Sequence, residues 1–368
     1  MQLRAELAAE RKSGSDAERG TEQSAAGATD GSAEARVERT STATRATAQA
    51  PTPTQAAPSQ PVPGEWSSQR ERSNMLALRV MAWIALHLGR RAARIVLLPV
   101  TLYFLAFAPG ARRQSRRYLA RALGRRPRLA DGWRHVHTFA SVVLDRLYFV
   151  RGALHEFELR VSGVELVDAT LAEGHGAFLL GAHVGSFEVL QAVGASRPDL
   201  RVAMVMYPGN AQMIEAVLRS VAPDLRLSII AIGRPGSTLS IRDWLDGGGL
   251  AGLLGDRFAP GEAARSAGVV RSFLGVPARF SDGPLRLAQL LRRRVIFMVG
   301  LYRGGRRYDV RFEELADFRR RPDDAAERER ALHDALSAYV QRLEALAREA
   351  PYNWFNFHDF WGEGERAR

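Results

Sequence analysis

One short segment combines a histidine and a glutamate with the small residues that a tight turn needs. Residues 181–188 read Gly-Ala-His-Val-Gly-Ser-Phe-Glu, so four positions separate His183 from Glu188. A histidine beside a carboxylate can act as a general base, because the carboxylate orients the imidazole and supports its developing positive charge. A turn between the two residues lets their side chains converge. We therefore predict a catalytic pair of His183 and Glu188, with a histidine bonded only to backbone as the plainer alternative.

Other common catalytic centres lack their residues in this sequence. There is no cysteine, which excludes a thiolate nucleophile, thiolate zinc ligands and disulfides. No Gly-x-Ser-x-Gly elbow, no His-Glu-x-x-His pair and no phosphate-binding glycine loop is present. His135 and His137 fall in an expected helix and are interpreted as structural. We expect neither a metal ion nor a cofactor.

The elements that must position these residues are short apolar runs alternating with amphipathic stretches. The strands are expected at residues 157–161, 177–181, 202–206, 227–232, 250–254, 294–302 and 309–312, and the helices at residues 132–150, 186–193, 211–221 and 325–347. This alternation predicts an α/β fold, a mixed, mainly parallel sheet flanked by helices. Active groups in such sheets gather at the carboxyl ends of strands, where His183 follows residues 177–181.

The chain divides into four parts by composition. Residues 1–73 are expected to be a disordered tail and linker, because residues 1–60 contain no Phe, Trp, Tyr or Ile and cannot build a core. Residues 74–130 are expected to hold apolar and basic helices that anchor the protein to a membrane. Residues 131–362 form the expected catalytic domain, and residues 363–368 a short tail.

The anchoring segment is apolar first and basic afterwards. Residues 95–108 carry no charge over 14 positions, which is too short to span a bilayer alone. Eight arginines follow between residues 112 and 128, with no acid among residues 111–130. This combination, with a net charge of +12, predicts docking on an anionic membrane from the cytoplasmic side. The alternative is a buried helix with a solvated basic face. A nucleic-acid partner is not expected, because it would not require the apolar run.

Several further motifs follow His183 and Glu188 in a fixed order. They are Tyr207-Pro208, Gly255-Asp256-Arg257, the Ser-Phe-Leu-Gly-Val-Pro-Ala of residues 272–278, the Gly-Pro-Leu-Arg-Leu-Ala of residues 283–288, and the aromatic run of residues 352–361. This order resembles the lysophospholipid acyltransferase superfamily, in the branch that contains the lipid A late acyltransferases. The resemblance covers about residues 75–361.

The resemblance implies a glycerol-phosphate acyltransferase-like fold and a fatty acyl transfer. The donor would be an acyl carrier protein or coenzyme A thioester, and the acceptor a hydroxyl or amine of a membrane lipid or glycolipid. The enzyme would work at the cytoplasmic face of the bacterial inner membrane, with His183 as general base and Glu188 holding its imidazole. A hydrolase using the same pair, and a non-catalytic basic membrane-binding protein, are the alternatives.

The remaining site residues are expected to bind substrate. Backbone N–H groups near Gly185 and Ser186 are candidates to stabilise the oxyanion of the tetrahedral intermediate. Arg257, Arg271 and Arg279 are candidates for the same role or for phosphate binding, with Asp256 orienting one of them. Tyr207 is assigned by the resemblance alone. Residues 352–361 are expected to be packed core in preference to a lipid-facing lip.

Overall fold

The main feature of the fold is a mostly parallel sheet. The computed structural model describes residues 83–85, 87–189, 194, 200–207, 228–233, 235–258, 268–320 and 322–362. In these residues the sheet has seven strands in the order β1-β9-β8-β2-β5-β3-β4. The strands are β1 (Glu158–Ser162), β2 (Phe178–Gly181), β3 (Val202–Met206), β4 (Ser228–Ala231), β5 (Leu250–Leu254), β8 (Arg294–Tyr302) and β9 (Arg307–Asp317). Only the neighbours β8 and β9 run antiparallel.

This sheet confirms the predicted α/β class and the predicted strands. The ranges 202–206, 250–254 and 294–302 match β3, β5 and β8 residue for residue. β9 is longer than the expected residues 309–312, because it forms a hairpin with β8 through the turn at residues 303–306. The central strands β2 and β5 are almost wholly buried, which explains why they read as continuous apolar runs.

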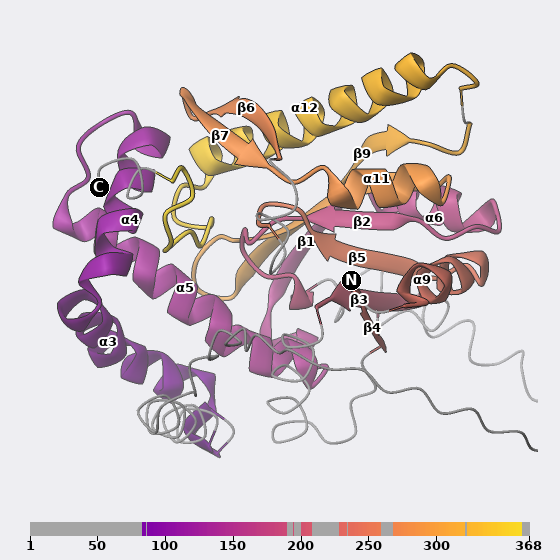
Figure 1. Cartoon of the computed structure of the whole chain (residues 1–368). Helices are drawn as coiled ribbons and strands as arrows, with labels where there is room; N and C mark the ends of the chain where they lie inside the picture. Colours follow the sequence, from indigo (N-terminus) through magenta and orange to yellow (C-terminus); the bar gives the residue numbers. More distant parts are fainter. Residues whose placement is uncertain are drawn as a thin grey trace, which may run out of the picture. The chain divides into compact units, whose positions relative to one another are not determined.

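Helices cover both faces of the sheet (Figure 1). One face packs against α9 (Ser237–Asp246), α11 (Gly283–Leu290) and α12 (Ala325–Glu349), and the other against α5 (Leu129–Val150) and α6 (Val164–Ala172). The predicted helices 132–150 and 325–347 are confirmed as α5 and α12. The predicted helix 211–221, residues 190–193 of the predicted helix 186–193, the 1–73 tail and the 363–368 tail lie outside the described residues.

Three helices and one hairpin were not expected from periodicity. They are α6, α9, α11 and a separate hairpin of β6 (Val269–Phe273) and β7 (Val276–Phe280). The hairpin contains most of the motif at residues 272–278, and its turn places Leu274 at a φ of 53°. A short 3₁₀ helix, η2 (Leu154–Glu156), leads from α5 into β1.

The segment expected to anchor the protein forms α3 (Gly89–Phe107) and α4 (Pro109–Leu123). Ala93 and Leu97 of α3 pack on Leu144 of α5, whereas the opposite side of α3 exposes apolar residues, of which Phe107 is 71% accessible. In the described part of the chain no single helix is long and apolar enough to cross a membrane; α3 and α4 reach that length together but meet at 95°.

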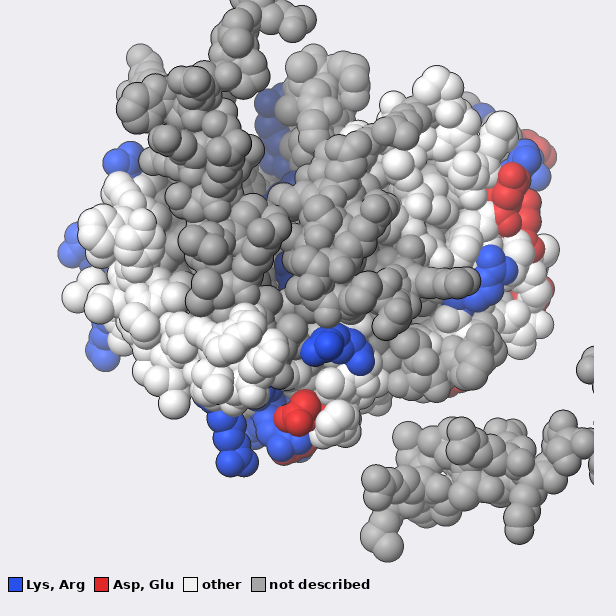
Figure 2. Space-filling model, turned by 90° about the horizontal axis from the view of Figure 1, so that it is seen from below, with Lys and Arg blue, Asp and Glu red and all other residues white. Residues whose placement is uncertain are grey.

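Basic side chains accompany this apolar surface. Arg112, Arg113 and Arg116 are exposed on α4, and Arg126 and Arg128 on the turn that follows it. Figure 2 shows basic side chains beside a broad uncharged area at its left edge, the side on which α3 and α4 lie in Figure 1. The opposite edge carries both signs of charge. Arg112 of α4 donates from Nη1 to the carbonyl of Leu105 on α3 (2.7 Å), so exposed basic side chains of α4 lie beside the end of α3.

Candidate active site

Two neighbouring parallel strands bring a histidine and an aspartate together. In the register of β2 and β5, Gly181 lies opposite Leu254, and each is the last residue of its strand. His183 and Asp256 both follow two residues later, so they emerge side by side at the carboxyl edge of the sheet. The backbone N–H of Gly255 donates to the carbonyl of Gly181 (3.0 Å), which continues the pairing past the strands.

Asp256 accepts three hydrogen bonds at this edge. Its Oδ1 accepts from Nδ1 of His183 (2.8 Å) and from the backbone N–H of the same residue (3.0 Å), and its Oδ2 accepts from the indole of Trp354 (2.9 Å). Burial alone would raise the pKa of the Asp256 carboxyl, but His183, Arg257 and Trp354 hold that pKa well below its usual range. The carboxylate is therefore ionised and fixed against the imidazole.

Glu188, the expected partner of His183, has different contacts. Its Oε2 accepts from Oγ of Ser186 (3.0 Å) and lies 3.0 Å from Nε of Arg146 on α5. The carboxylate that contacts His183 is therefore Asp256, which corrects the expectation that Glu188 holds the imidazole and that Asp256 orients an arginine. The reason is topological: β5, the hydrogen-bonded neighbour of β2, supplies the partner, whereas the carboxylate of Glu188 lies beside Arg146 of α5.

The turn between His183 and Glu188 depends on Gly185. This residue has a φ of +62°, and a Cβ atom on it would lie 2.0 Å from the carbonyl oxygen of Gly300 on β8. Its N–H donates to the carbonyl of Asn353 (2.8 Å), and that of Ser186 donates to Gly300 (2.9 Å). These two N–H groups stabilise the turn, so they do not supply the oxyanion donors that we expected from them.

The aromatic run near the C-terminus supports the site from behind. Trp354 is buried and pairs with Val184 as an isolated β-bridge, and the N–H of Phe355 donates to the carbonyl of His183 (2.9 Å). His135 on α5 in turn bonds the carbonyl of Trp354 through Nε2 (2.9 Å) and Oγ of Ser115 through Nδ1 (2.8 Å). Burial lowers the pKa of His135 to about 4, so it stays neutral at neutral pH, in accord with its predicted structural role.

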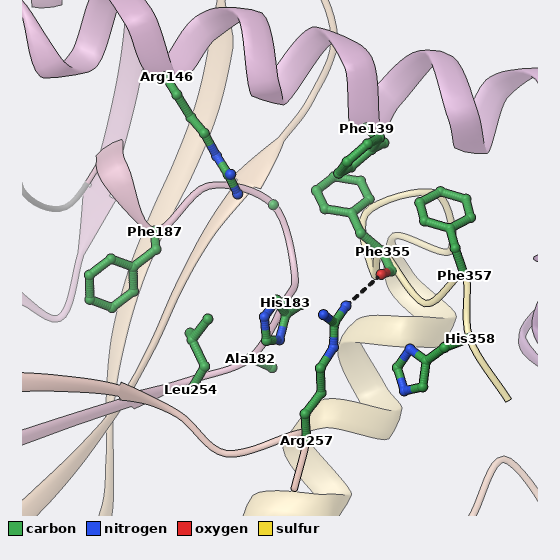
Figure 3. Close-up of a pocket in the computed structure, with 11 residues that line it drawn as sticks. Phe139, Arg146, Ala182, His183, Phe187, Leu254, Arg257, Phe355, Phe357 and His358 are labelled. Carbon is green, nitrogen blue, oxygen red and sulfur yellow. Dashed lines mark hydrogen bonds between the residues drawn. The ribbon is translucent and has the colours of Figure 1, made fainter. Parts of the chain in front are cut away.

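A pocket of about 430 Å³ opens beside His183 (Figure 3). Its wall is mainly apolar, and it also contains His183, two arginines and a second histidine. The described lining residues are Phe139, Arg146, Ala182, His183, Gly185, Phe187, Leu254, Arg257, Phe355, Phe357 and His358. The His183 side chain is 30% accessible, whereas that of Asp256 is 1% accessible. One imidazole thus faces the pocket with its supporting carboxylate buried behind it.

Only some of the predicted substrate-binding residues line the pocket. Gly185 and Arg257 line it, and Arg257 also donates from Nη2 to the carbonyl of Phe355 (3.0 Å). Arg271 instead donates to Oγ of Ser337 (3.0 Å), which ties β6 to α12, and Arg279 is exposed on β7. The ring of Tyr207 lies against Gly233, after the ends of β3 and β4. Within the described part of the chain, neither Arg271, Arg279 nor Tyr207 belongs to the pocket wall.

Sequence reasoning missed several wall residues. Arg146 falls on the side of α5 that faces the pocket, and the Asp145-Arg146 pair within an otherwise apolar stretch of this helix was a usable signal. Phe355, Phe357 and His358 line the pocket, while Trp354 is buried outside its wall, so the aromatic run is part core and part wall. The sequence of residues 352–361 does not indicate which of its aromatic residues belong to the core and which line the pocket.

No metal-binding cluster of three or more His, Asp or Glu residues occurs among the described residues. The site instead offers a general base with an ionised partner, two cationic side chains and an apolar wall. No family model matches the chain, and no curated protein matches it either.

Proposed function

We propose that the protein is an acyltransferase that moves a fatty acyl group from a thioester of acyl carrier protein or coenzyme A to a hydroxyl or amine of a membrane lipid or glycolipid. The observation that carries this proposal is the hydrogen bond from His183 Nδ1 to the buried carboxylate of Asp256, beside an apolar pocket. A polar base next to an apolar wall suits a substrate with one reactive end and a long hydrocarbon chain. The motif order described above supports the same activity.

The proposed reaction needs one base and no covalent enzyme intermediate. Because Nδ1–H of His183 donates to Asp256, Nε2 carries the lone pair that accepts a proton. As Nε2 removes the proton of the acceptor hydroxyl, the hydroxyl oxygen attacks the thioester carbonyl carbon and a C–O bond forms. When the tetrahedral intermediate collapses, the C–S bond breaks and the imidazolium returns the proton to the departing thiolate. Asp256 stays ionised and stabilises the imidazolium between these steps.

The oxyanion of the tetrahedral intermediate needs a donor in the pocket. The backbone N–H groups of residues 183–186 already have acceptors. Arg257 and Arg146 both line the pocket, and Figure 3 shows the guanidinium group of Arg257 beside the His183 ring and that of Arg146 extending from α5 toward the pocket. Arg257 is the better candidate, because Arg146 is already paired with Glu188. In this arrangement Glu188 acts by positioning Arg146, and the two cations can also hold phosphate of the donor or acceptor.

The proposal places the enzyme on the cytoplasmic face of a bacterial inner membrane. Ile95, Leu102 and Phe107 expose an apolar stripe on α3, and the exposed arginines of α4 lie next to it. An apolar stripe that enters the interface, beside cations that contact anionic headgroups, describes a helix pair lying on a bilayer. This docking would bring a lipid acceptor to the same side of the sheet as α5, whose residues line the pocket.

Vesicle flotation tests the docking surface. Ile95→Glu/Leu102→Glu should abolish binding to neutral and anionic vesicles, whereas Arg112→Gln/Arg113→Gln/Arg116→Gln should weaken only anionic binding, by about 100-fold at about 1 kcal/mol per charge. The control is Leu239→Glu/Leu290→Glu, which adds the same two charges at exposed residues of α9 and α11 (54% and 70% accessible). If the control and the α3 variant bind vesicles equally well, α3 is not part of the docking surface.

The activity itself is tested with labelled acyl thioesters and total membrane lipid in detergent. Label should enter a lipid product with the wild type, and His183→Ala should reduce this transfer by at least about 10³-fold, the scale of losing a general base. Labelled free acid without a lipid product would identify a hydrolase. Membrane binding without turnover of any thioester would favour a non-catalytic binding protein.

A further inference from the structure

One contact in the pocket wall joins the turn after β2 to the middle of the sheet. Phe187 lines the pocket, and the tip of its ring lies where a side chain on Gly252 would begin. A Cβ atom on Gly252 would be only 2.4 Å from Cζ of Phe187, far closer than packed carbon atoms approach. The ring can therefore occupy this position only because residue 252 is glycine.

Gly252 lies on the strand that also carries a wall residue of the pocket. Side chains two positions apart point to the same face of a strand, so Leu250, Gly252 and Leu254 share one face of β5. Leu254 lines the pocket, whereas Leu250 is buried in the core that Phe187 packs against. The ring of Phe187 thus covers the strand between the pocket and Leu250, and it ends the pocket on that side.

We propose that Phe187 and Gly252 set the length of the acyl chain that the pocket accepts, with the Phe187 ring as its floor. This inference rests on the proposed acyl transfer, because an acyl group that reacts beside His183 needs an apolar cavity for its chain. Leu254 supplies an apolar wall between His183 and the ring, and Phe139 and Phe355 line the pocket on the other side of His183. A chain of the preferred length ends against the ring, and a longer chain clashes with it.

Two substitutions should move the chain-length preference in opposite directions. Phe187→Ala uncovers β5 from Leu254 to Gly252, which lengthens the cavity by about 6.6 Å, the rise of two strand residues. Gly252→Ala places a methyl group where the ring tip lies, so the ring must move away from the sheet and into the pocket. Each methylene gained or lost should change relative kcat/KM by about fourfold, the factor for burying one CH₂ group.

The double variant gives the sharpest test of the contact. In Phe187→Ala/Gly252→Ala the added methyl group has no ring to displace. The chain-length preference of this double variant should therefore stay close to that of Phe187→Ala alone. This strong non-additivity is expected only when one residue acts through the other. Phe312→Ala serves as control, because it removes a buried phenyl ring of β9 that does not line the pocket. It should lower stability and keep the wild-type preference.

The measurement is a competition among saturated acyl thioesters of increasing length, in even-carbon steps, with the products identified by mass spectrometry. Opposite shifts in the single variants and a long-chain preference in the double variant are the expected result. Unchanged preferences in both single variants, or shifts that add in the double variant, would overturn the proposal.

A second readout separates this inference from the proposed function. If the wild type transfers no acyl group to lipid, the acyltransferase proposal fails, and the pocket floor is then tested by the binding of free fatty acids of the same lengths. Their binding is measured by the rise in the thermal unfolding midpoint of each variant. The pocket-floor proposal is supported if the fatty acid that stabilises best is longer for Phe187→Ala and shorter for Gly252→Ala. It is rejected if both variants are stabilised best by the same length.

Discussion

Asp256→Asn should lower kcat for acyl transfer by about 10³- to 10⁴-fold while the protein remains folded, a loss of the size found when a triad aspartate becomes asparagine. The carboxylate accepts from Nδ1 of His183 at 2.8 Å, which leaves Nε2 free of its proton. The amide of asparagine can instead donate to Nδ1, and the proton then resides on Nε2, where it blocks base catalysis. Single-turnover transfer rates measure the loss, and circular dichroism confirms the fold.

Glu188→Gln is the matched control for this prediction. It also replaces a carboxylate by an amide near His183, but its contacts are with Ser186 and the partly exposed Arg146. A loss of less than about tenfold is expected, because such an ion pair contributes about 1 kcal/mol or less. The double variant His183→Ala/Asp256→Asn should be no slower than His183→Ala, since the two residues act as one unit. Loss of transfer in Glu188→Gln with near-normal rates in Asp256→Asn would restore Glu188 as the partner.

This pair of residues also shows how far sequence reasoning reaches. The strand before His183 and the strand before Asp256 are both apolar runs of the length that buried strands have, and both were predicted. The position of each polar residue, just past the carboxyl end of a strand, follows from those predictions. The sequence therefore indicated that both side chains lie on the reactive edge of the sheet.

The sequence did not show that the strands before His183 and Asp256 are neighbours in the sheet. β2 and β5 are separated along the chain by β3 and β4, yet they are adjacent in the sheet. Apolar alternation reports which segments are strands and is silent about their order, so the nearest carboxylate in sequence, Glu188, was preferred to Asp256. The same limit hid Trp354, since its bond to Asp256 joins residues 98 positions apart. Long-range pairing depends on tertiary packing, which no local pattern encodes.

The second large effect concerns the buried ion pair that holds α3 against α5. Arg90 and Asp145 form a bidentate ion pair, with Nε–Oδ1 at 2.7 Å and Nη2–Oδ2 at 2.8 Å, and Tyr308 of β9 donates to the same carboxylate at 2.8 Å. The Asp145 side chain has no accessible surface. Arg90→Leu should lower the free energy of unfolding by about 3–5 kcal/mol, because it leaves a buried carboxylate without its cation. Urea unfolding of the purified protein measures this loss.

Two further variants show whether the loss comes from the unpaired charge or from packing. Arg90→Leu/Asp145→Leu removes both charges and should recover much of the lost stability, since a buried ion pair can be replaced by apolar groups at little cost. Arg348→Ala breaks the exposed pair with Glu344 (2.9 Å) and should cost less than about 1 kcal/mol. A double variant as unstable as the sum of its single variants would assign the effect to packing. Because Arg90 joins α3 to α5 and to Gly305 in the turn between β8 and β9, the charge explanation also predicts that Arg90→Leu weakens vesicle binding and that the double variant restores it.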